Sequence, residues 1–158
     1  MEHYYRVEIY NYDEEKTIGG LMSAIVALIA KKEGIKPDIP QDELAKVFAN
    51  SKKPEVKELL GILNVLMQGV PYPEAYLKDK ENRICLFTEA DFAQKRLFLE
   101  LLNAHVENEM PDCEIVYCDF ELPPEVILYK DEHQIVISLD TYKEYHSGIY
   151  YAAFEEDE

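Results

Sequence analysis

The chain contains three cysteines and four histidines, the residue types that most often bind metals or serve as nucleophile and base. They are Cys85, Cys113, Cys118, His3, His105, His133 and His146. Zinc sites usually pair cysteines two to four residues apart and repeat the pair, whereas the two nearest cysteines here are five residues apart without a second pair. The spacing predicts buried, inert thiols and no metal site. Cys118 and His146 remain a candidate nucleophile–base pair if the fold brings them together.

Acidic side chains in the second half of the chain are the candidate partner-binding residues. Residues 1–80 carry 11 Lys and Arg against 13 Asp and Glu, a net charge of −2, whereas residues 81–158 carry 5 against 19, a net charge of −14. A dense acidic surface attracts basic protein surfaces and repels nucleic acid and anionic membranes. The candidates chosen on charge are Glu114, Asp119, Glu121, Asp131, Glu132 and Glu144.

The charge distribution predicts an acidic protein–protein interaction module that binds a basic surface of a macromolecular partner, for instance of a nucleic-acid-binding enzyme. A narrower version is an inhibitor that mimics nucleic acid, with carboxylates in place of phosphates, in the manner of anti-restriction and anti-CRISPR inhibitors. That likeness rests on charge alone, and solubility by itself also explains an acidic surface. No direct binding to nucleic acid or to a membrane is expected.

Two alternatives stay open. The first is a small enzyme or ligand-binding domain with a pocket between sheet and helices, where His105, Cys118 or His146 would converge. The second is a structural subunit of a homo-oligomer that uses exposed tyrosines and an edge strand. Because the carboxylates lack an EF-hand register and no glycine-rich phosphate motif is present, the sequence predicts no catalytic residue, no cofactor and no metal.

The first third of the chain predicts a strand and a helix. Residues 4–12 alternate between two faces and are rich in tyrosine and β-branched residues, which is typical of a strand. Apolar residues then recur at helical spacing from Ile18, after a polar run whose acids suit a helix start, and Gly34 ends that helix. Gly19 and Gly20 are interpreted as allowing close packing of the helix on a sheet rather than as a phosphate cradle.

The remaining segments predict a mixture of helices and hairpins. Two stretches, 77–89 and 128–140, share a Lys-Asp pair, a polar turn and a short apolar run that ends at a capping residue, so both are predicted to be hairpins followed by helix starts. The broad apolar stripe after Thr88 predicts a long helix over 89–109. Alternation over 113–122 predicts a strand, and residues 149–154 predict a last strand.

These elements together predict an α+β fold with a mainly antiparallel sheet of hairpin-connected strands and helices packed on one face. Residues 1–154 are expected to form a single globular domain, which includes a small helical insert at 36–70, and residues 155–158 an acidic tail. The odd number of cysteines, the absence of a signal peptide and the short apolar stretches predict a cytoplasmic protein. Homo-oligomerisation remains compatible with the sequence.

Overall fold

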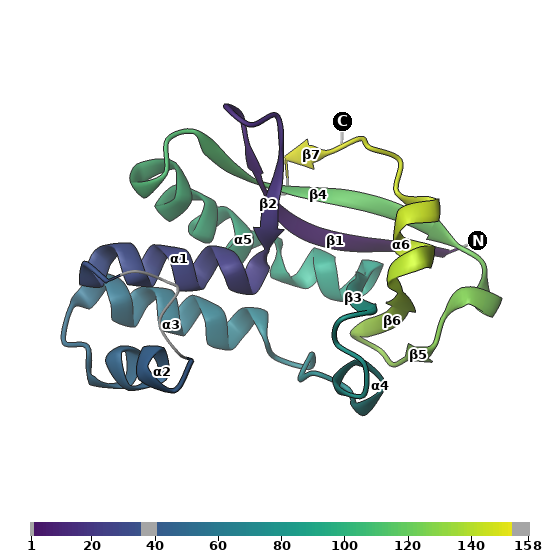
Figure 1. Ribbon diagram of the computed structural model, residues 1–158, viewed down its shortest axis with the longest axis horizontal. Coiled ribbons are helices and arrows are strands. Elements are labelled where there is room, and N and C mark those ends of the chain that lie inside the picture. Colours follow the sequence, from purple (N-terminus) through teal and green to yellow (C-terminus); the bar gives the residue numbers. More distant parts are fainter. Residues whose placement is uncertain (1, 36–40, 153–158) are drawn as a thin grey trace.

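The computed structural model describes residues 2–35 and 41–152, which form an α+β fold (Figure 1). The strands are β1 (Glu2–Asn11), β2 (Lys16–Gly20), β3 (Arg83–Thr88), β4 (Cys113–Leu122), β5 (Tyr129–Lys130), β6 (Gln134–Ser138) and β7 (Tyr151–Ala152). The helices are α1 (Leu21–Glu33), α2 (Gln41–Asn50), α3 (Pro54–Leu66), α4 (Glu74–Leu77), α5 (Glu89–Glu109) and α6 (Leu139–Tyr145), with a 3₁₀ turn at Pro124–Val126. The predicted acidic tail at 155–158 lies outside the described residues.

The strands form one antiparallel sheet in the order β5-β6-β3-β1-β4-β7, and β2 also pairs with β1. β1 is a central strand of the sheet, between β3 and β4. It pairs with β4 along the whole length of β1, from Glu2 opposite Leu122 to Asn11 opposite Cys113. The other edge of β1 is shared by two strands, since β3 pairs only with Tyr4 and Tyr5, and β2 only from Glu8 onwards. β1 therefore has a fork on this edge, between β3 and β2.

Helices cover both faces of the sheet, with the larger layer on one face (Figure 1). On that face, buried residues of α1, α3 and α5 form one core with inward-facing residues of β1 and β4, such as Val7 and Ile115. On the other face, side chains of α6 pack over a smaller core that contains Tyr4, Phe120 and Ile135. This division follows from the alternation along each strand, which sends successive side chains to opposite faces.

Helix caps confirm two of the predicted helix starts. The hydroxyl of Thr88 accepts a hydrogen bond from the Asp91 N–H at 3.3 Å and begins α5. The hydroxyl of Ser138 accepts one from the Thr141 N–H at 3.0 Å and begins α6. Both caps satisfy amide groups that the first helical turn leaves without partners.

Two predicted elements are wrong. The polar run before Ile18 is a turn rather than a helix start, and residues 16–20 form β2, so α1 begins only at Leu21. The stretch 77–89 is not a hairpin, because no strand precedes its turn: Leu77 is the last residue of α4, and residues 78–82 lead into β3. The second predicted hairpin is confirmed by the pairing of β5 with β6.

The segment predicted as a helical insert contains α2 and α3, and α3 contributes to the main core. Val56, Leu59, Ile62 and Leu66 of this helix are buried in the core that α1 and α5 share. Within residues 2–35 and 41–152, no helix combines the length and apolar character that crossing a bilayer requires.

Candidate functional site

The three candidate carboxylates on β4 lie on different faces of the sheet. Successive side chains of a strand point to opposite faces. Glu114, at an even position, is therefore on the face that α6 covers, whereas Asp119 and Glu121, at odd positions, project from the opposite face. Glu114 accepts a hydrogen bond from the Tyr12 hydroxyl, and this bond, with burial, raises the pKa of Tyr12 to about 12. Asp119 lies 2.8 Å from His3 Nδ1, and this hydrogen bond raises the pKa of His3. Glu121 is exposed.

The other three candidates lie in the β5–β6 turn and on α6. Asp131 stabilises the turn by accepting hydrogen bonds from the backbone N–H groups of His133 and Gln134 at 2.8 and 2.9 Å. Burial raises the pKa of Asp131, but these bonds and one from Tyr129 outweigh burial, so the pKa is lowered. Glu132 and Glu144 are exposed. The six carboxylates thus occupy both faces and a turn.

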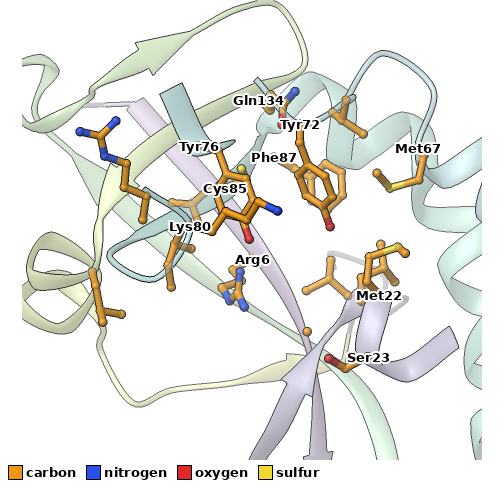
Figure 2. A pocket seen from close by; sticks show the side chains of 18 of the residues that line it. Arg6, Met22, Ser23, Met67, Tyr72, Tyr76, Lys80, Cys85, Phe87 and Gln134 are labelled. Atoms are coloured by element: carbon orange, nitrogen blue, oxygen red, sulfur yellow. The ribbon is translucent and has the colours of Figure 1, made fainter. Parts of the chain in front are cut away.

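A cavity of about 400 Å³ lies between the sheet and the helices, at the fork on the edge of β1. Its lining includes Arg6 and Val7, which pair with neither β2 nor β3 and so lie at the gap between these two strands. The start of α1, the segment after α3 and residues of β3 complete its lining (Figure 2). Sequence reasoning suggested His105, Cys118 or His146 for such a pocket, and none of them lines this cavity.

The residues predicted to line a pocket contact other parts of the protein. His105 lies on α5 with its Nε2 3.5 Å from a carboxylate oxygen of Glu58. Cys118 and His146 are on the face of the sheet that α6 covers, where the thiol is 3.8 Å from the Ser147 hydroxyl. His146 Nε2 instead lies 2.8 Å from the Tyr150 hydroxyl. The candidate pairing of Cys118 with His146 is therefore not supported by these contacts.

The cavity has a polar side and an apolar side (Figure 2). Arg6 and Lys80 lie on one side of the view, and Met22 and Met67 lie on the other. Tyr72 lies between them, and its ring stacks on that of Tyr76 with the centroids 4.9 Å apart. A concave site with apolar walls and a few convergent polar groups is the usual form of a small-molecule site.

Arg6 is held in place by a buried carboxylate. Glu8 is only 5 % exposed, and its Oε1 accepts hydrogen bonds from Arg6 Nε at 3.4 Å and from the Tyr142 hydroxyl at 2.9 Å. Burial, and then the charge of Glu8, raises the pKa of Tyr142, so this hydroxyl stays protonated and donates. The Arg6 guanidinium also lies over the Tyr142 ring, 5.7 Å from its centroid. These contacts fix the direction of the Arg6 side chain at the fork.

A buried ionic cluster supports the segment after α3 that forms one wall of the cavity. Lys95 donates to Asp91 at 2.6 Å and to the carbonyl oxygen of Gln68 at 2.7 Å, and Asp91 also lies 2.9 Å from His133 Nδ1. Asp91 and Lys95 are 2 % and 4 % exposed. The His133 ring packs against Gly69, where an added Cβ would lie 2.7 Å from the ring. The cluster thus sets the position of the cavity wall at Met67 and Val70.

Sequence reasoning missed this cluster and also Arg6. The spacing of Asp91 and Lys95 fits an ordinary i, i+4 pair on a helix surface, and nothing local shows that both are buried. Across residues 2–35 and 41–152, no three His, Cys, Asp or Glu side chains are grouped so that they could hold a metal ion.

Cys85 lines the cavity, so the rate at which its thiol is modified measures how accessible the cavity is. Burial raises the pKa of this thiol to about 11, although the charge of Arg6 acts in the opposite direction. Since only the thiolate reacts, we expect its modification by methyl methanethiosulfonate to accelerate about tenfold per pH unit from about pH 7 to pH 10. Peptide mapping by mass spectrometry measures this rate, with free cysteine as the control. A rate that levels off near the ordinary thiol pKa of about 8.5 would contradict the burial of Cys85.

No family model matches the chain, and no curated protein or solved structure matches it at a significant level.

Proposed function

We propose that this protein is a ligand-binding domain that holds a small molecule in the cavity at the fork of β1. The observation that supports the proposal is the cavity itself, whose volume of about 400 Å³ lies within the range of about 300–1,000 Å³ typical of ligand sites. Arg6 at its base is already oriented by Glu8 and Tyr142, so little ordering is needed when a ligand binds.

A thermal-shift and fluorescence screen of naphthalene derivatives with neutral, anionic and cationic substituents tests the proposal. We expect at least one derivative to bind, and we expect binding to be lost in Met22→Trp, whose larger side chain fills the cavity. Leu97→Trp is the matched control, because Leu97 lies on the surface of α5 and is 62 % exposed. The proposal is wrong if no derivative binds, or if Met22→Trp binds as well as the control.

A second proposal concerns the acidic surface. We propose that exposed carboxylates of the second half of the chain dock on a basic partner. The net charge of −14 over residues 81–158 and the exposure of Glu121, Glu132 and Glu144 favour it, whereas the position of Glu121 and Glu144 on opposite faces of the sheet does not. Binding to a panel of basic proteins, including nucleases, should weaken steeply with salt. No binding at low salt to any member of the panel would remove this proposal without affecting the first.

A further inference from the structure

The charged residues that line the cavity are mostly cationic. The charged lining residues are Arg6, Lys80, Arg83 and Glu81, with a formal charge of +2. Glu8 lies behind Arg6 and bonds its Nε, so with Glu8 included the formal charge at the cavity is +1. The chain as a whole carries −16. The cavity is therefore cationic although the protein as a whole is anionic. The whole protein attracts cations, whereas the cavity attracts anions.

Arg6 has hydrogen-bonding capacity left for a ligand. Its Nε bonds Glu8, and its two Nη groups have no hydrogen-bond acceptor within the part of the chain that the structure describes. Gly20 allows this arrangement, since a Cβ at that position would lie only 3.1 Å from Arg6 Nη2. A guanidinium with free Nη donors is suited to bidentate bonds with a carboxylate or phosphate.

Lys80 is the second available cation. It is exposed at the cavity, and its Nζ forms no ion pair with any residue in 2–35 or 41–152. Arg83, in contrast, donates from Nη1 to the carbonyl oxygen of Ala75 at 2.5 Å and is used to hold α4. The start of α1 adds to the same field, because its first turn lines the cavity and contains no acidic residue.

The opposite side of the cavity suits an apolar group. Met22 and Met67 lie across the cavity from Arg6 in Figure 2, and Val70 and Phe87 also line it. Thioether side chains adapt to irregular shapes and make favourable contacts with aromatic rings. The two sides therefore call for a ligand with a charged end and an aromatic or aliphatic body.

We infer that the ligand is an organic anion, with a carboxylate or phosphate group at Arg6 and Lys80 and an apolar body against Met22 and Met67. This inference rests on the proposed function and specifies its ligand class. It is independent of the acidic surface, because the residues that carry it are cationic or apolar.

Three probes with the same naphthalene body test the inference: 2-naphthoate, its neutral isostere 2-naphthamide, and 2-naphthyl phosphate. We expect the two anions to bind at least about tenfold more tightly than the amide, as one charge-assisted hydrogen bond would provide. Whichever anion binds more tightly identifies the head group. Equal or tighter binding of the amide would overturn the inference and leave the proposed function standing. Absence of binding by all three would overturn the inference, and absence of binding by the cationic derivatives of the screen as well would overturn the proposed function.

Substitution of Lys80 tests whether the charge of this side chain contributes to the binding of anionic probes. Lys80→Gln should weaken binding of the anions about three- to tenfold and leave the amide unchanged. Lys78→Gln is the matched control, since Lys78 is exposed in the same turn but does not line the cavity. Equal effects of the two substitutions would show that only the overall charge of the protein matters, which contradicts the inference.

Charged thiol reagents measure the field in the cavity without any ligand. The anionic 2-sulfonatoethyl and the cationic 2-(trimethylammonio)ethyl methanethiosulfonates both form a disulfide with Cys85 and release methanesulfinate. Relative to free cysteine, we expect the ratio of the anionic to the cationic rate to rise severalfold at Cys85 and to fall in Lys80→Gln. A ratio that favours the cation, as the net charge of the protein alone would give, overturns the inference.

Discussion

Replacing Asp91 with alanine is expected to lower the free energy of unfolding by about 3–5 kcal/mol. The substitution leaves Lys95 buried without its carboxylate partner, and a buried ammonium group is costly when it is unpaired. Lys95 is 4 % exposed and has the carbonyl oxygen of Gln68 as its other acceptor. Urea denaturation monitored by circular dichroism measures the change.

The double substitution Asp91→Leu with Lys95→Met is the control for this prediction. It removes both charges and keeps apolar volume, so it should cost much less than Asp91→Ala alone. His133 then loses its partner, but its side chain is 38 % exposed and can bond to water. A single substitution that costs less than about 1 kcal/mol would show that the cluster does not stabilise the fold.

Replacing Leu66 with alanine is expected to lower the free energy of unfolding by about 2–5 kcal/mol. Leu66 is completely buried at the end of α3, and its loss would leave a cavity in the core shared by α1, α3 and α5. Because Met67 follows directly and lines the ligand cavity, the same substitution should also weaken probe binding. Thermal denaturation and probe titration measure the two effects.

Leu97→Ala is the matched control on an exposed position. Leu97 is 62 % exposed on α5, so its truncation should change the free energy of unfolding by no more than about 0.5 kcal/mol. Equal costs at the two positions would contradict the assignment of α3 to the main core. In that case α3 would not pack in the core that α1 and α5 share.

The elements with strong periodicity could be predicted from the sequence. β4 alternates over part of its length, and α5 has a broad apolar stripe and a capping threonine, so both patterns are local. β1 is predicted on the same basis. The α+β class follows from these elements and is confirmed by the antiparallel sheet.

The predictions failed where a local pattern had two structural meanings. The acids before Lys16 suit a helix start, but they form the turn of the β1–β2 hairpin, with Glu15 at a positive φ of 54°. β2 is short and ends in Gly19 and Gly20, so it lacks the alternation that marks a strand. At residues 77–89, the polar turn is real, but the segment that precedes it is helical.

The cavity could not be predicted because its lining comes from distant parts of the chain. Arg6, Gly20, Met67 and Cys85 meet only when β2 and β3 share one edge of β1. No local pattern shows that these strands pair with the same edge. For the same reason, the charge split suggested an acidic surface as the main feature, and a small cationic cavity within an acidic protein was not anticipated.

The central claim is that a ligand occupies the cavity at the fork of β1, and Cys85 provides the most direct measurement. The rate at which methyl methanethiosulfonate modifies Cys85 should fall in proportion to the occupancy by bound 2-naphthoate, and protection should disappear in Met22→Trp. If 2-naphthoate binds while Cys85 reacts at an unchanged rate, the ligand lies elsewhere and the account is contradicted.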